Sequence, residues 1–135
     1  MNFMLKATRP LSIDFSLLLL RLLAGLGMAF GHGLPKLQSF SSKADGFHDA
    51  FGLPSELSLG LAIFAEFFCA LLVSIGLFSR LALVPLIITM AVAVFDVHWT
   101  DGFGKMEKAL LYLIAYLAIF FGGAGKFSVD KVIKR

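Results

Sequence analysis

The sequence predicts an all-α integral membrane protein, folded as an antiparallel four-helix bundle. Of its 135 residues, 59% are hydrophobic and only 16% are charged, whereas soluble domains are typically about 45–50% apolar and about 25% charged. The mean hydropathy of +0.88 and several long apolar segments agree with this class. These observations predict a single transmembrane domain over residues 1–135, embedded in a lipid bilayer.

The predicted transmembrane helices span residues 15–31, 57–78, 81–97 and 109–123. Each segment approaches the roughly 20 residues needed to cross a hydrocarbon core, and a chain in lipid must satisfy its backbone groups internally, which favours helices. Arg21 interrupts the first apolar segment, so we expect an uncleaved helix there rather than a signal peptide. The turns at residues 76–80 and 98–105 are short, which makes neighbouring helices antiparallel.

The connection between the first two helices is longer, and its residues 37–54 are compatible either with a short interfacial helix or with an irregular loop.

The charged residues outside the helices predict the orientation of the protein in the membrane. Seven basic residues lie on the side of the termini: Lys6, Arg9, Arg80, Lys126, Lys131, Lys134 and Arg135. The opposite side has Lys36, Lys43 and Lys105, and Lys108 lies at its edge. This bias predicts that both termini are cytoplasmic.

Arg21 and Glu66 are the charges that need a partner, because each lies about half-way along an apolar segment. If these helices are antiparallel neighbours, the two side chains reach the same depth and form a buried ion pair. Two roles remain open for this pair: it fixes the helix register, or it lines a ligand cavity or proton path.

A second polar cluster is predicted at the outer end of the bundle, where the topology gathers His32, Lys36, Asp96, His98 and Glu107. An interfacial polar rim, a metal site, a haem site and a site for a quinone or another flat amphipathic ligand are the alternatives. No metal-ligand spacing is diagnostic, so no metal is assigned. Tyr112 and Tyr116, one helical turn apart, are candidates for core packing or for the lining of a cavity.

Several separate blocks of the chain resemble the DoxX family of small bacterial membrane proteins: the arginine of the first helix, HGLPKL, FGLPSELSLGLAIFAEFFCALLVSIGLFSR and GGAGKFSVD. The resemblance implies four transmembrane helices in the bacterial cytoplasmic (inner) membrane. The residues that match the family's motif positions are Arg21, His32, Gly33, Lys36, Glu66, Gly76, Arg80, Gly125, Ser128 and Asp130. Some members or relatives are linked to a thiosulfate:quinone oxidoreductase and to oxidative-stress complexes, which suggests a redox partner.

The sequence leaves three functions open. The first is a non-catalytic membrane component that binds a protein partner or a small amphipathic ligand. The second is a membrane subunit of a quinone-linked oxidoreductase, and the third is a small carrier or channel, for which oligomers would supply the lumen. No catalytic residue is assigned, and quinone is the one candidate cofactor.

Cys69 is the single cysteine, so dithiol chemistry within the chain is excluded. No nucleotide-binding or nucleic-acid-binding pattern is present.

Overall fold

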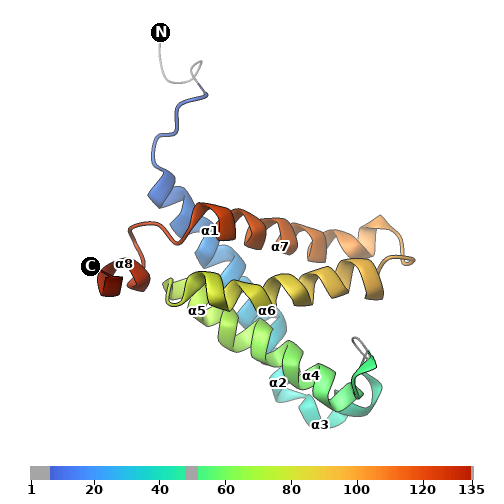
Figure 1. Cartoon of the computed structure of the whole chain (residues 1–135). Helices are drawn as coiled ribbons and strands as arrows, with labels where there is room; N and C mark the ends of the chain where they lie inside the picture. The colour runs from blue at the N-terminus through green and yellow to red at the C-terminus, as the bar shows by residue number, and fades with distance from the viewer. Residues whose placement is uncertain (1–6, 48–51, 135) are drawn as a thin grey trace.

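The computed structural model describes residues 7–47 and 52–134, and every regular element of this part is a helix (Figure 1). The α-helices are α1 (Ile13–Met28), α2 (Leu34–Gln38), α3 (Phe40–Lys43), α4 (Ser55–Ile63), α5 (Ala70–Ile75), α6 (Ser79–Val92), α7 (Phe103–Gly122) and α8 (Val129–Lys134). Three π-helical segments, η1 (Ala29–Gly33), η4 (Phe64–Cys69) and η5 (Ala93–Val97), and one short 3-10 helix, η2 (Ala44–Gly46), lie between or after them.

Within the described residues, three continuous helices are long and apolar enough to cross a membrane: Ile13–Gln38, Ser55–Ile75 and Ser79–Val97. The first extends beyond its predicted end at Gly31. Pro35 is tolerated there because it lies in the first turn of α2, directly after the π-helical segment. α7 begins earlier than predicted, and its first turns carry Lys105, Glu107 and Lys108. These charges distinguish α7 from the three apolar helices, so a fourth crossing stays a prediction.

The helices diverge toward the end of the molecule that lies away from the termini. In Figure 1, α6 and α7 lie side by side and antiparallel, while α4 diverges from them toward α2 and α3. α1 packs against α5 on one side and against α7 on the other. The α5–α6 turn and α8 lie together at the opposite end (Figure 1). The fold therefore has a closed end near the termini and a more open end.

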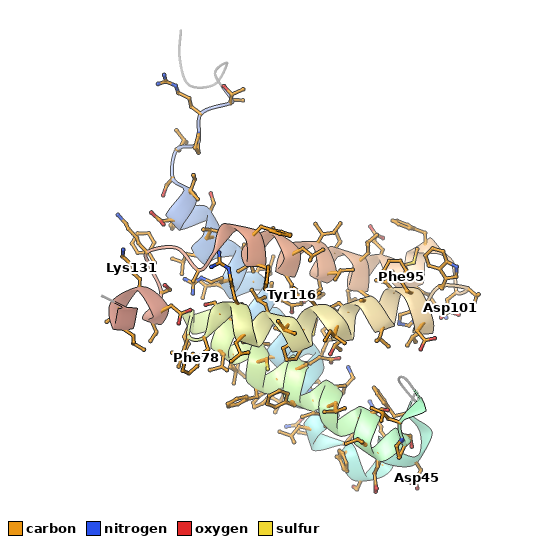
Figure 2. The ribbon with its side chains drawn as sticks, viewed as in Figure 1. Asp45, Phe78, Phe95, Asp101, Tyr116 and Lys131 are labelled. Carbon is orange, nitrogen blue, oxygen red and sulfur yellow. The ribbon has the colours of Figure 1, made fainter. Side chains whose placement is uncertain are left out.

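Small side chains allow the close packing of α1 against α5. A Cβ atom on Gly25 would lie 2.1 Å from Ser74 Oγ and 2.7 Å from the carbonyl oxygen of Ala70. On the other side of α1, the buried Tyr116 donates a hydrogen bond of 2.9 Å to the carbonyl oxygen of Ala24. Figure 2 shows Tyr116 in the centre of the molecule, between α7 and α1. The contacts fix the register of α1 between its two neighbours.

The loop after α2 contains α3 and η2, which confirms helical structure in part of residues 37–54. Ser55 Oγ donates a hydrogen bond to the carbonyl oxygen of Ala44, and this bond ties the loop to the start of α4. His48, which the predicted topology places on the same side as the outer cluster, lies outside the described residues.

Candidate functional site

Lys36 and Glu66 form an ion pair inside the open end of the molecule. Lys36 Nζ lies 2.6 Å from Glu66 Oε1, and the two side chains are 23% and 6% exposed. Lys36 comes from α2 and Glu66 from the π-helical segment η4. The carboxylate is therefore almost removed from solvent and is neutralised by the ammonium group.

Gly33 makes this pair possible, because it lets the backbones of η1 and η4 approach each other. A Cβ atom at Gly33 would lie 2.6 Å from the carbonyl carbon and oxygen of Glu66 and from the nitrogen of Phe67. Only a residue without a side chain fits this contact. Lys36 lies about one helical turn after Gly33, and its side chain extends from α2 to the Glu66 carboxylate.

A cavity of about 280 Å³, here called the apolar cavity, lies between α4 and α6. Its apolar wall is formed mainly by Leu53, Leu61, Ala62, Ile88, Val92 and Val97. Leu61 and Ile88 are 49% and 48% exposed, so the cavity borders the apolar outer surface of the protein. Lys36 and Glu66 also line it.

A second cavity of about 430 Å³, here called the charged cavity, lies between η1, η5 and the start of α7. Its polar lining consists of His32, Lys36, Glu66, His98, Lys105, Lys108 and Tyr112. Lys36, Glu66, Ala93 and His98 line both cavities and form their shared wall. The ion pair thus lies where an apolar and a charged space meet.

The three π-helical segments all contribute to this region. His32 belongs to η1, Glu66 to η4, and Ala93 to η5, and these three residues line the charged cavity. π-helical turns are rare and occur frequently at functional sites. Their convergence on one pair of cavities marks this end of the molecule as the candidate functional site.

The predicted Arg21–Glu66 ion pair is wrong. The register of α1 against its neighbour places Gly25 beside Ala70 and Ser74, and Gly33 beside Glu66. Twelve residues of helix separate Arg21 from Gly33, which corresponds to about 18 Å. The estimate of equal depth failed because the first helix continues through α2, so its midpoint lies well beyond Arg21.

Arg21 is fully buried and instead binds the end of α5. Its Nη1 donates to the carbonyl oxygens of Ser74 at 3.1 Å and Val73 at 3.5 Å, and its Nη2 donates to that of Phe127 at 2.5 Å. Carbonyls in the last turn of a helix have no partner within the helix and carry its negative dipole end. A guanidinium group matches both features.

Asp130 complements this arrangement at the start of α6. Its carboxylate accepts hydrogen bonds from the backbone N–H groups of Phe78 at 2.8 Å and Ser79 at 2.9 Å, and from Ser79 Oγ. Gly76, with φ of +75°, forms the turn beneath it, and a Cβ there would lie 2.4 Å from Ser128 Cβ and 2.6 Å from Arg21 Nη1. Arg21, Gly76, Ser128 and Asp130 are together called the turn clamp.

The predicted outer cluster is brought together in part. His32, Lys36 and His98 line the charged cavity, whereas Asp96 and Glu107 are exposed and are absent from its described lining. His98 Nδ1 lies 3.1 Å from Asp101 Oδ2. Glu66 joins the cluster in place of the two predicted acids. Among the described residues, no group of three histidine, cysteine, aspartate or glutamate side chains is placed to hold a metal ion.

The two tyrosines have different positions. Tyr112 lines the charged cavity, and its ring lies edge-on to that of His32 at 5.8 Å between centroids. Tyr116 is buried in the core and bonded to α1. Lys105 and Lys108 also line the charged cavity and were not predicted in the cluster, although their spacing of about one turn at the start of a helix was a usable signal.

Residues 16–99 match the DoxX family. The chain belongs to the DoxX family. It is therefore a membrane protein, and the resemblance noted in the sequence is confirmed. The matched region includes Arg21 and the Lys36–Glu66 pair, whereas Asp130 of the turn clamp lies beyond it.

Two relatives from Haemophilus influenzae are both described as uncharacterised proteins. One is 29% identical to this DoxX protein over 114 residues, covering 78% of the chain and 76% of the relative. The other is 34% identical over 107 residues, covering 73% of the chain and 77% of the relative. No solved structure matches the chain.

Proposed function

We propose that this DoxX protein is a membrane-embedded binding protein for a small amphipathic molecule, held at the Lys36–Glu66 pair. The observation that carries the proposal is that one ion pair, with a buried carboxylate and a partly buried ammonium group, lines both an apolar and a charged cavity. An amphipathic molecule has one part suited to each space. Ligand sites typically combine an apolar lining with a few polar groups, in volumes of about 300–1,000 Å³.

The energetics of the pair support the same proposal. Removing two charges from water costs free energy that their attraction often only offsets, so a buried ion pair is weak evidence for a stabilising role. Ionisable side chains within membrane helices are candidates for functional sites. A ligand that shields or rearranges the pair gives a reason for its presence.

We also propose the membrane that holds the protein and its orientation there. The excess of basic residues near the termini supports cytoplasmic termini in a bacterial inner membrane. In that orientation the charged cavity faces the outer interface. Labelling of single cysteines introduced at exposed positions near Arg9 and Thr100, in a Cys69→Ser background, measures this orientation directly.

A quinone-linked oxidoreductase subunit is the second candidate, and one observation favours it. His32 and Tyr112 lie together in the charged cavity and offer hydrogen-bonding groups to the carbonyls of a quinone ring. The protein itself would supply the binding site, and a partner would supply electrons. A quinone recovered from the purified protein supports this candidate.

Native mass spectrometry of the detergent-purified protein, followed by solvent extraction, tests the binding function. We expect one amphipathic molecule per chain in the wild type. Ala93→Phe introduces a large side chain at the shared wall and is expected to remove the bound molecule. Ala118→Phe adds the same ring on the exposed face of α7 and serves as the control.

Val97→Phe, which fills the apolar cavity alone, provides a second blocking variant should Ala93→Phe fail to fold. Equal occupancy in the wild type and in both folded blocking variants would contradict the proposed site. A wild-type protein that is empty after reconstitution with native lipids would contradict the proposed function.

A further inference from the structure

The charges that line the two cavities define the head group of the proposed ligand. The described lining of the charged cavity contains three lysines, Lys36, Lys105 and Lys108, and one acid, Glu66, which leaves two formal positive charges. Glu66 is already paired with Lys36. The nearby acids Asp96 and Glu107 do not belong to this described lining. The electrostatic balance therefore favours an acidic head group over a neutral or basic one.

The apolar cavity defines the tail. Its lining is mainly aliphatic, with polar residues that include the Lys36–Glu66 pair, and the exposed Leu61 and Ile88 at its border belong to helices that are long and apolar enough to cross a membrane. A chain can therefore enter this cavity from the hydrocarbon core without crossing a polar surface. Lys105 and Lys108 are exposed at the rim of the charged cavity, where a membrane protein meets its polar interface.

The shared wall joins the two spaces. Ala93 is the small side chain in this wall, and Lys36 borders both cavities. A molecule that lies across the wall places its head near the lysines while its tail remains among the aliphatic residues. A lysine ammonium group on a flexible side chain is suited to bind such a head as a point charge.

We infer that the ligand is a single-chain amphipath with an anionic head, bound with its head at Lys36, Lys105 and Lys108 and its tail in the apolar cavity. This inference rests on the proposed binding function and names the chemical class of its ligand. Carboxylate and phosphate heads share the required charge.

The test measures binding of dodecanoate, dodecyl phosphate and dodecanol to the full chain in lipid nanodiscs, by isothermal titration calorimetry. The three probes have the same chain length and differ in head charge. We expect both anions to bind about ten-fold or more tightly than dodecanol. Lys105→Gln and Lys108→Gln should each weaken binding of the anions about two- to five-fold, with little change for dodecanol.

Lys43→Gln is the matched control, because Lys43 is an exposed lysine of α3 that does not line the described part of either cavity. It should bind all three probes as the wild type does. Dodecanol binding as tightly as the anions, or an equal loss for all probes in the rim variants, would overturn the anionic head. Failure of all three probes to bind the wild type would overturn the proposed binding function itself.

Discussion

This protein has two regions in which charged side chains are removed from solvent, and the partners of these charges differ between them. In the turn clamp, Arg21 has no exposed surface, and its guanidinium group is held by backbone carbonyls of three residues. In the open end, Lys36 and Glu66 hold each other and border two cavities. The comparison shows that burial of a charge in a membrane helix does not by itself mark a ligand site. A cavity of about 750 Å³ also borders the turn clamp, but its described lining contains Ser128 and Asp130 and not Arg21. What distinguishes the open end is that both charges of its ion pair line cavities, one of which has a mainly apolar lining.

The largest effect is expected from Arg21→Met. Methionine keeps much of the side-chain volume but removes every donor to the carbonyls of Val73, Ser74 and Phe127. Breaking a buried charged network costs about 3–5 kcal/mol, so we expect a large fall in thermal stability and yield. Arg9→Met, at an exposed position, is the control. A stability close to that of the control would mean that the clamp is dispensable.

Gly33→Ala should have the next largest effect, since its Cβ would lie 2.6 Å from the backbone of Glu66. Separating η1 from η4 is expected to cost about 1–3 kcal/mol and to weaken the Lys36–Glu66 pair. Gly31→Ala is a matched control in the same π-helical segment, because no described atom outside its own helix turn lies within 4 Å of a Cβ there. Equal unfolding temperatures for the two variants would contradict the close approach.

Asp130→Ala tests the other half of the turn clamp. The change removes the carboxylate that accepts the N–H groups of Phe78 and Ser79 at the start of α6. Loss of such a helix cap costs about 0.5–2 kcal/mol, measured by chemical or thermal unfolding. Asp45→Ala, at an exposed position of η2, should change stability by less than about 0.5 kcal/mol. Identical losses in the two variants would argue against the cap.

A pair of double-mutant cycles gives the smallest but most specific effect. Lys36→Gln and Glu66→Gln should be coupled by about 1 kcal/mol, because the two side chains are in contact. Arg21→Lys and Glu66→Gln should be additive within about 0.5 kcal/mol, because they lie in different regions. The reverse pattern, measured as unfolding free energies, would restore the Arg21–Glu66 pair that the structure replaces.

Much of the fold is readable from the sequence because hydrophobic length is a strong signal. The three apolar helices and the short turn between the second and the third follow directly from it. The continuation of the first helix through Pro35 does not, because proline normally ends a helix and only the adjacent π-helical segment accommodates it. That single extension shifts the register and changes the partner of Glu66.

The sequence predicted several residues of the site but not the ion pair that they form. His32, Lys36 and His98 were expected at one end because topology gathers loop ends, and the structure brings them to one cavity. Depth along a helix was a poor guide for Arg21 and Glu66, since a long side chain can reach a helix terminus instead of a neighbour at its own level. The backbone carbonyls that receive Arg21 carry no residue-specific signal in a sequence.

The most direct test of the central claim compares ligand-induced stabilisation in the two regions. Dodecanoate and dodecanol are added to the wild type, Asp130→Ala and Ala93→Phe, and the shift in unfolding temperature is recorded. A bound ligand at 100 times its Kd stabilises a protein by about 2.7 kcal/mol. We predict that at least one probe stabilises the wild type and Asp130→Ala equally, and that neither probe stabilises Ala93→Phe. Loss of the shift in Asp130→Ala, with the shift retained in Ala93→Phe, would contradict the assignment of the two regions.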